Sequence, residues 1–272
     1  MSYFGFLVLF LIPPIALLGA GLWKVRRLHH PLPTNWSRYP AWAAIALLAG
    51  IALCYTTPWD NYLVASGVWV YARHLVSGIV IGWVPLEEYL FFLLQPVLTG
   101  LCLLLMAHVM PTDAEYASSD KKIPVAVVSG LGFLILCWAI ACWILVTGWQ
   151  PGYYLALQWI WALPPIALQI YIGKDLLWQA RRPLALTILA MTTYLSVADA
   201  IAIQCGVWSI NPQMSLSVLI GGILPLEEAL FFLQTNVLLV CGIYLFLNPI
   251  THERLGTLWR RQEWVLLKRS GS

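Results

Sequence analysis

Long apolar runs separated by short polar segments dominate the pattern of hydrophobic and polar positions along this chain. A bilayer-spanning helix needs roughly 20 consecutive apolar residues, and seven stretches reach or approach that length. The predicted spans cover about residues 3–23, 41–59, 77–108, 123–148, 153–173, 184–204 and 217–247. The third and seventh are longer than one crossing requires, and each carries a proline before its acidic residues. This predicts a tilt, a kink or a short re-entrant start.

The composition of the chain supports a membrane protein. Of the 272 residues, 61% are hydrophobic and 10% are charged, whereas a soluble domain carries about 25% charged residues. We therefore expect an all-α integral membrane protein that crosses the bilayer several times. The six cysteines all lie in apolar spans without a CxxC pair, so we expect packing residues rather than disulfides or a metal site.

The basic residues predict the orientation of the spans. With the N-terminus outside, fourteen of the fifteen Lys and Arg residues fall in inner loops or the C-terminal tail, and only Arg73 falls outside. Inner loops of membrane proteins carry such an excess, so we predict an N-out, C-in chain. The first span lacks a basic start and continues as a full-length helix, which favours a retained helix over a cleaved signal peptide. Topology accounts for the net charge of +3, and no nucleic-acid partner is expected.

Four short segments recur in the same order in both halves of the chain. They are IPPIAL at 12–17 with LPPIAL at 163–168, Asp60 with Asp199, GVW at 67–69 with GVW at 206–208, and PLEEYLFF at 85–92 with PLEEALFF at 225–232. The offsets between the copies are 151, 139, 139 and 140 residues. Ordered anchors with nearly constant spacing indicate an internal duplication.

The duplication predicts two three-helix repeats joined by a linker helix, a 3+1+3 arrangement. The predicted units are 1–110 for the first repeat, 111–150 for a loop and the linker helix, 151–250 for the second repeat, and 251–272 for a basic cytoplasmic tail. Four helices separate equivalent elements, so the repeats are parallel and an axis along the membrane normal should relate them. The glutamate pairs should then share one depth, eight to eleven residues inside their helices and well below the outer surface.

Six acidic residues are predicted to lie within the apolar spans or near their ends: Asp60, Glu87, Glu88, Asp199, Glu227 and Glu228. No lysine or arginine lies within a predicted span to neutralise them. An unpaired carboxylate in an apolar medium is costly and holds its proton instead, which makes this cluster a candidate general acid. The alternative is that the glutamates only join helices. Adjacent helical positions point about 100° apart, so one glutamate of each pair should face a cavity while its neighbour braces another helix.

Aromatic and amide side chains accompany the acids along the chain. The candidate substrate-binding residues are Trp69, Phe91, Phe92, Gln95, Trp208, Phe231 and Phe232. Aromatic faces attract cations, so an acid that protonates an alkene and aromatic walls that stabilise the resulting cation form a coherent pair. Such aromatics are also common packing residues in membrane helices, and that alternative stays open.

At these positions the sequence resembles the small, membrane-integral lycopene cyclases. The resemblance rests on WDNYLVASGVW and PLEEYLFFLLQ in the first half and on ADAIAIQCGVW and PLEEALFFLQT in the second. It covers essentially the whole chain in the fused two-repeat form; other members are separate three-helix subunits or are joined to phytoene synthase in fungi. The second half has ADA at 198–200 where the first has WDN at 59–61, and Asn236 where the first has Pro96. The two halves are therefore expected to be unequal.

The resemblance implies a lycopene β-cyclase, which closes both ψ-ends of lycopene without net redox change and forms γ-carotene and then β-carotene. It implies that the glutamates are the proton donor and its partner, and that the aspartates polarise, relay or accept the proton. Lycopene would come from the bilayer of a prokaryotic inner membrane, with membrane lipid and other carotenoid-pathway enzymes as neighbours. No cofactor is expected: GLG at 130–132 lies within a span and lacks the rest of a dinucleotide fingerprint.

Several other functions fit part of the pattern. An ε-type cyclase or a cyclase of C50 carotenoids would use the same residues. A SWEET-like small-solute transporter shares the 3+1+3 repeat, but here the polar residues cluster toward the outer half, which disfavours an aqueous pathway. A non-catalytic membrane subunit would use the glutamates as structural contacts. A retinal protein is excluded because residues 217–247 contain no lysine for a Schiff base.

Overall fold

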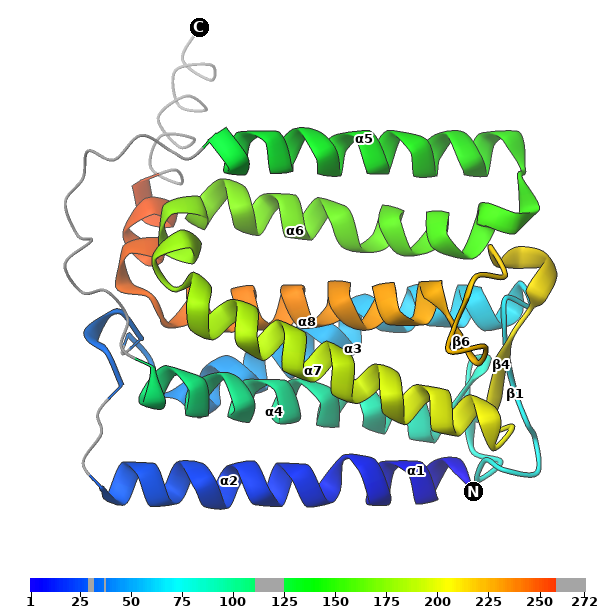
Figure 1. The fold of residues 1–272 in the computed structure, drawn as a ribbon, viewed down its shortest axis with the longest axis horizontal. Helices are drawn as coiled ribbons and strands as arrows, with labels where there is room; N and C mark the ends of the chain where they lie inside the picture. The colour runs from blue at the N-terminus through cyan, green and yellow to red at the C-terminus, as the bar shows by residue number, and fades with distance from the viewer. Residues whose placement is uncertain (29–31, 37, 111–124, 258–272) are drawn as a thin grey trace, which may run out of the picture.

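The computed structural model describes residues 1–28, 32–36, 38–110 and 125–257, which form a bundle of long helices (Figure 1). The helices are α1 (Tyr3–Phe10), α2 (Ile12–Arg27), α3 (Ala41–Ala65), α4 (Leu86–Val109), α5 (Val125–Thr147), α6 (Tyr153–Gln179), α7 (Arg181–Gln204) and α8 (Leu226–Leu247). Residues 111–124 of the predicted loop and linker segment (111–150) and most of the predicted tail at 251–272 lie outside the described residues.

Seven helical stretches among the described residues are long and apolar enough to cross a membrane, with α1 and α2 together forming the first. The predicted number of spans is therefore confirmed. Leu11 separates α1 from α2, and Pro13 and Pro14 follow at the start of α2. Proline is tolerated there because the first N–H groups of a helix have no partner within it.

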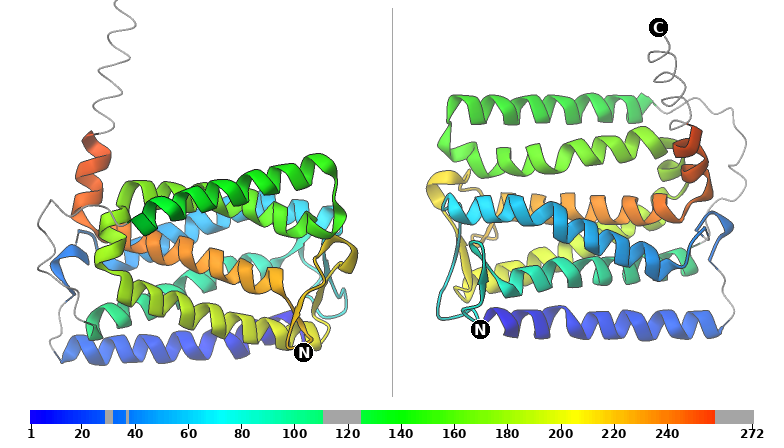
Figure 2. Two further views of the ribbon diagram at one scale, coloured as in Figure 1. Left: turned by 45° about the horizontal axis from the view of Figure 1, so that its top comes forward. Right: turned by 180° about the vertical axis from the view of Figure 1, so that it is seen from behind.

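The helices α4 and α8 form the centre of the bundle. They bury 61% and 67% of their most apolar windows, against 39% or less in the other spans. The Gln95 amide donates a hydrogen bond to the Thr235 hydroxyl at 3.0 Å, and the Thr99 hydroxyl donates to Asn236 at 2.9 Å. Such polar contacts replace the hydrophobic driving force that lipid does not provide. Helix α5 lies at one edge of the bundle and α2 at the opposite edge (Figures 1 and 2).

Two β-hairpins occupy the segments that were predicted as the starts of the third and seventh spans. Strand β2 (Val80–Ile81) pairs with β3 (Val84–Pro85), and β5 (Leu219–Ile220) pairs with β6 (Leu224–Pro225). The predicted helix starts at residues 77 and 217 are therefore wrong, since α4 begins at Leu86 and α8 at Leu226.

Glycines with positive φ explain why these apolar residues turn back instead of continuing a helix. Gly82 has φ 67° in the first hairpin, and Gly221 and Gly222 have φ 61° and 73° in the second. Residues other than glycine rarely adopt this region. Two residues connect the paired strands in the first hairpin and three in the second. This single extra residue changes the offset between the halves from 139 before the hairpin to 140 at the glutamates.

A third small sheet joins the two halves at the same end of the bundle, which we call the hairpin end (Figure 1). Strand β1 (Trp69–Tyr71) pairs with β4 (Trp208–Ile210), and Val70 lies opposite Ser209 at the centre of the ladder. The ladder extends on both sides, through Ala72 N–H to the Val207 carbonyl at 3.0 Å and through Asn211 N–H to the Val68 carbonyl at 2.9 Å.

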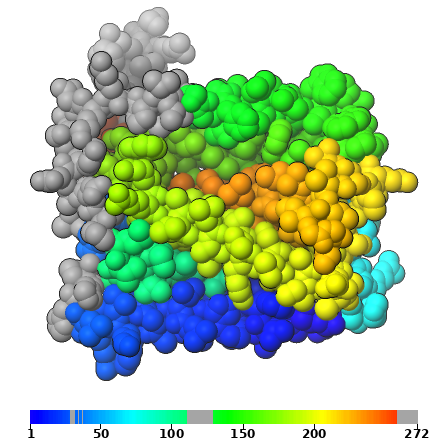
Figure 3. All heavy atoms as spheres, viewed as in Figure 1, coloured from blue at the N-terminus to red at the C-terminus, as the bar shows by residue number. Residues whose placement is uncertain are grey.

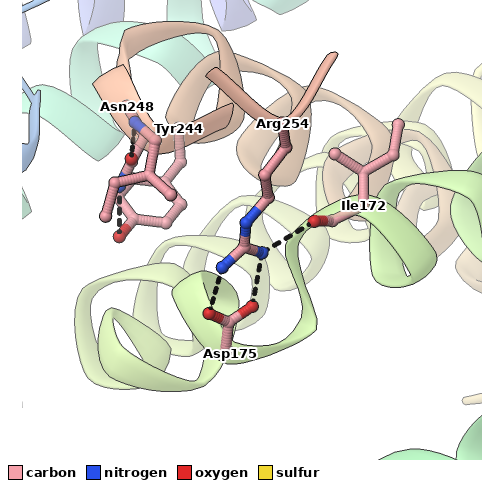
Figure 4. A network of polar contacts seen from close by, with 6 residues as sticks. Ile172, Asp175, Tyr244, Asn248 and Arg254 are labelled. Atoms are coloured by element: carbon pink, nitrogen blue, oxygen red, sulfur yellow. Dashed lines mark hydrogen bonds and ion pairs between the residues drawn. The ribbon is translucent and has the colours of Figure 1, made fainter. Parts of the chain in front are cut away.

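An ion pair fixes the last described segment at the opposite end of the bundle (Figure 4). The Arg254 guanidinium donates to both carboxylate oxygens of Asp175, at 2.7 and 2.5 Å, and to the Ile172 carbonyl at 3.0 Å. Since Asp175 and Ile172 lie in α6, this contact holds the short helix at residues 249–257 against that span. Both side chains of the ion pair are partly exposed, so the pair contributes little to stability beyond this positioning.

Candidate active site

The six predicted acidic residues lie together at the hairpin end of the bundle. Their side chains are at most 2% exposed: Asp60 on α3, Glu87 and Glu88 on α4, Asp199 on α7, and Glu227 and Glu228 on α8. The prediction that the glutamates lie eight to eleven residues inside their helices is wrong. They occupy the first turns of α4 and α8, because the hairpins take up the apolar residues that precede them.

The first glutamate of each pair anchors the hairpin that leads into its helix. Glu87 accepts hydrogen bonds from the Ser77 N–H at 2.5 Å and the Ser77 hydroxyl at 3.1 Å. Glu227 accepts them from the Leu216 N–H at 2.6 Å and the Ser215 hydroxyl at 3.0 Å. The bracing contact predicted for one member of each pair thus exists, but it goes to the preceding loop and not to another helix.

The second glutamate of each pair is bound by tyrosine hydroxyls. Glu88 accepts hydrogen bonds on one oxygen from Tyr3 and from Tyr71, the latter at 2.9 Å. Glu228 accepts one from Tyr154 at 2.7 Å, and its Oε2 has no partner among the described residues. The offset of 151 that relates the two PPIAL segments also relates Tyr3 to Tyr154. The two tyrosines therefore hold equivalent positions in the two halves.

Tyr71 makes the two halves unequal. It lies in β1, outside the spanning helices, and burial together with the negative charges of Asp60 and Glu88 raises the pKa of its hydroxyl. The group therefore keeps its proton and serves as a donor. The equivalent position, at an offset of 139, is Ile210, so Glu228 has no counterpart of this second hydrogen bond.

The aspartates differ between the halves as well. Asp199 accepts a hydrogen bond from the Trp208 indole at 2.7 Å. In the first half neither oxygen of Asp60 nor the indole N–H of Trp69 has a partner within the described part of the chain. Electrostatic interactions nevertheless connect the halves, because Glu88 lies close enough to Asp60, Asp199 and Glu228 for their charges to interact. The acids thus form one cluster at the interface of the halves.

A stack of three aromatic rings lies beside this cluster. The Trp59 ring centroid is 4.7 Å from that of Trp161 and 5.7 Å from that of Phe231, with interplanar angles of 19° and 8°. Trp59 is also fixed by a hydrogen bond from its indole to the Leu157 carbonyl at 3.0 Å. Trp59 was not among the predicted site residues, and neither was Trp161. Trp161 is equivalent to Phe10 at the offset of 151, which would have predicted that it lies in the first helix of the second repeat. The offset does not predict that it lies beside the acids.

An apolar groove of about 390 Å³ extends from this stack toward the opposite end of the bundle, between α3, α6 and α8. Three of the predicted substrate-binding residues line it: Phe92, Gln95 and Phe231. The other four do not. Trp69 and Trp208 lie in the β1–β4 sheet, and Phe91 and Phe232 pack against each other in the core, with ring centroids 6.3 Å apart.

The sequence predicted the acids but not the groups that hold them. Tyr3, Tyr71, Tyr154, Ser77 and Ser215 all donate hydrogen bonds to the glutamates. A tyrosine or serine in an apolar stretch has no sequence signal that separates it from a packing residue. The repeat offset relating Tyr3 to Tyr154 was the one signal that could have found the first of these pairs.

Comparison with known proteins gives consistent relatives over most of the chain. A lycopene beta-cyclase of Halobacterium salinarum is 36% identical over 247 residues, which cover 90% of this chain and 95% of that protein. A bifunctional lycopene cyclase/phytoene synthase of Sporisorium reilianum is 35% identical over 252 residues, which cover 90% of this chain and 35% of that protein. A second bifunctional lycopene cyclase/phytoene synthase, from Leptosphaeria maculans, is 32% identical over 251 residues, which cover 88% of this chain and 40% of that protein. No family model matches the chain, and no solved structure gives a significant match.

Proposed function

Because this chain belongs to the lycopene cyclase family, we propose that it closes the ψ-ends of lycopene to β-ionone rings, giving γ-carotene and then β-carotene. The terminal alkene gains a proton, the next alkene attacks the tertiary cation, and the ring loses a proton. Each ring therefore forms without net transfer of electrons. The observation that carries the proposal is the buried cluster of six carboxyl groups beside a stack of aromatic rings.

We propose that the second glutamate of each pair is the proton donor. Glu228 is fixed through one oxygen by Tyr154, while its Oε2 lacks a hydrogen-bond partner in the described residues and is free to face a substrate. Glu87 and Glu227 are instead fixed by a backbone N–H and a serine hydroxyl of the segment that leads into each helix. The Oε2 of Glu227 also lacks a partner among the described residues, so the choice of Glu228 rests on its bond from Tyr154. The nearby Asp60 and Asp199 would accept or relay the proton that leaves the ring.

The aromatic stack would stabilise the carbocation between these two proton transfers. Trp59, which precedes Asp60 in the chain, stacks with Trp161 and Phe231, and aromatic faces attract positive charge. A cation in an apolar site has no water to solvate it, so the rings and the deprotonated carboxylate provide its stabilisation. The same exclusion of water protects the cation from being trapped as an alcohol.

The seven spans make the protein a multi-pass integral membrane protein. We propose that it lies N-out and C-in in a prokaryotic cell membrane, with parallel repeats at 1–110 and 151–250 joined by a linker helix. The β1–β4 ladder supports this arrangement, because its central pair, Val70 and Ser209, is related by the repeat offset of 139. An antiparallel ladder centred in this way has a local two-fold axis, which is the relation expected of parallel repeats.

A second pair of hydrogen bonds supports the same relation between the repeats. The Tyr55 hydroxyl donates to the Trp161 carbonyl at 2.8 Å, and the Tyr194 hydroxyl donates to the Phe10 carbonyl at 2.7 Å. Tyr55 and Tyr194 differ by 139 residues, and Phe10 and Trp161 by 151. Each bond joins the second helix of one repeat to the first helix of the other.

Expression in a bacterial host that accumulates lycopene tests the proposed function. We expect conversion of lycopene to β-carotene, with chromatography and mass spectrometry separating β-rings from ε-rings and C40 from C50 products. Unchanged lycopene, with the protein present in the membrane, would refute the assignment. Purified protein in liposomes is expected to work without flavin or nicotinamide, and a strict requirement for a reduced cofactor would refute the redox-neutral reaction.

Replacing Tyr154 by phenylalanine is expected to slow cyclisation roughly tenfold or more, because a hydrogen bond to a charged group is worth about 1.5–3 kcal/mol. Tyr3→Phe is the matched control at the equivalent position, and its effect should be smaller because Glu88 keeps its bond from Tyr71. Initial rates in liposomes measure both. Equal losses in the two variants would contradict the unequal support of Glu88 and Glu228.

A further inference from the structure

The apolar groove and the equivalent surface of the other half differ, although the chain is duplicated. On the rear face, α3 crosses beside α6 (Figure 2, right), and the groove lies between these helices and α8. Leu47 and Tyr55 of α3 line it, and their equivalents at an offset of 139 are Leu186 and Tyr194 of α7. On the front face, where α7 lies open (Figure 3), these two residues border a shallow hollow that α7 alone lines.

A glycine lets side chains of α3 and α6 pack closely against α8 at the floor of the groove. Gly242 lines it, and a Cβ added there would lie 2.9 Å from the Leu48 Cδ1 and 3.1 Å from the Gln169 Nε2, closer than side chains normally approach. At an offset of 140 the equivalent position on α4 is Cys102, whose side chain is buried. The two halves therefore differ in volume at the place where a second groove would have its floor.

The lining of the groove fits a long hydrocarbon. It has few polar groups, and three of them have partners within the protein: Gln95 donates to Thr235, the Gln169 amide N–H donates to the Leu238 carbonyl at 3.0 Å, and His252 contacts the Phe246 carbonyl at 2.8 Å. The Gln169 Oε1 and the Thr251 hydroxyl have no partner among the described residues. The groove follows α8 from Phe231 to Phe246, which is about 22 Å at 1.5 Å per residue. An extended, largely apolar molecule therefore fits the groove.

The groove ends one helical turn from three of the acids. Thr56, Phe92 and Phe231, which line its end, lie one helical turn from Asp60, Glu88 and Glu228 respectively, a spacing that places each pair on one helix face. Trp161 of the aromatic stack also lines this end.

The aromatic stack has no equivalent in the other half of the site. At offset 139 the residue that corresponds to Trp59 is Ala198, and at offset 151 the residue that corresponds to Trp161 is Phe10. The groove and the aromatic stack thus lie on the same side of the acid cluster.

We propose that this groove holds the polyene chain of the substrate while one end reaches the acid cluster, and that both rings are closed from this one side. The inference rests on the proposed cyclase function and adds to it a binding site and an order of events. Because one groove presents one end at a time, the monocyclic product must leave and bind again in the reverse direction. The two repeats then build one active site and not two.

A bulky side chain in the groove tests the binding site. Leu168 lines the groove and is 56% exposed, and its equivalent at offset 151, Leu17, is 73% exposed on the other repeat. Leu168→Trp should raise the KM for lycopene about tenfold or more by steric exclusion. Leu17→Trp, the matched control, should stay within about twofold of the wild type. Both positions face outward, so both variants should fold.

The outcomes separate this inference from the proposed function. Equal rates in the Leu168→Trp and Leu17→Trp variants, or a larger loss in the latter, would overturn the one-sided groove while leaving the cyclase assignment intact. Failure of the wild-type protein to convert lycopene would instead refute the proposed function itself. If phospholipid rather than substrate occupies the groove, Leu168→Trp will leave the KM for lycopene unchanged, which also overturns the proposal.

A trapping experiment tests the order of events. Wild-type protein in liposomes receives isotopically labelled lycopene together with an excess of unlabelled γ-carotene. If the protein releases γ-carotene after the first ring closure, the label should collect in γ-carotene. The rate at which labelled β-carotene forms should then fall in proportion to the dilution by unlabelled γ-carotene. Labelled β-carotene that forms at an undiminished rate would show that both ends are processed in one visit, and would overturn the single-groove account.

Discussion

Replacing Glu228 by glutamine is expected to lower the closure of both rings by about 100-fold or more, the usual contribution of a general acid. Glutamine has nearly the same shape, and its carbonyl oxygen can still accept the hydrogen bond from Tyr154. The variant therefore loses the proton at Oε2 while keeping the packing around it. Initial rates of lycopene consumption and of γ-carotene consumption, measured separately in liposomes, report the two ring closures.

The control for this variant is Glu253→Gln, which alters an exposed glutamate at the opposite end of the bundle and should leave the rate unchanged. Glu88→Gln should also slow the reaction, since Glu88 shares the acid cluster. Folded Glu228→Gln protein that keeps more than about a tenth of the wild-type rate would contradict its role as the donor. Loss of only one of the two ring closures would contradict a single composite site.

Replacing Glu227 by alanine is expected to destabilise the protein rather than to remove its acid. The change leaves the Leu216 N–H and the Ser215 hydroxyl without their acceptor at the base of the hairpin. Each unsatisfied buried group costs roughly 1–3 kcal/mol. We therefore expect a lower unfolding temperature and a lower yield, with a milder effect for Glu227→Gln because its amide oxygen still accepts.

Thermal unfolding of the detergent-purified protein, with the rate per folded molecule measured in parallel, tests the anchoring role. Glu87→Ala is the matched variant in the first half, where Ser77 would lose its acceptor, and it should behave in the same way. An unchanged unfolding temperature combined with a loss of activity would make Glu227, and not Glu228, the better candidate for the donor.

The helices and the acids could be predicted from the sequence because both leave strong signals. A charge in an apolar stretch is visible without any structure, and seven long apolar runs are difficult to interpret otherwise. The hairpins were missed because an apolar run such as IVIGWV at 79–84 fits a span as well as a turn. Gly82 and the Gly221–Gly222 pair were the available signals, but glycine also occurs within membrane helices.

The arrangement around the acids could not be predicted because it depends on contacts between distant segments. Tyr3 reaches Glu88 across 85 residues, and Tyr154 reaches Glu228 across 74. The packing at the floor of the groove depends on the absence of a side chain at Gly242, because Leu48 and Gln169 occupy the space next to it. The inequality of the two halves was predicted because Ala198 replaces Trp59 in the second half. Only the structure shows that the aromatic stack therefore lies on one side of the acid cluster.

Cyclisation in D₂O tests the central claim, that a carboxyl group of the cluster protonates the substrate. The glutamates lie in the first turns of α4 and α8, next to the hairpin end, so their protons should exchange with water between turnovers. Over many turnovers by purified protein in liposomes, mass spectrometry should find one deuterium for each ring, one in γ-carotene and two in β-carotene. β-Carotene that carries no deuterium would contradict ring closure by proton donation from these acids.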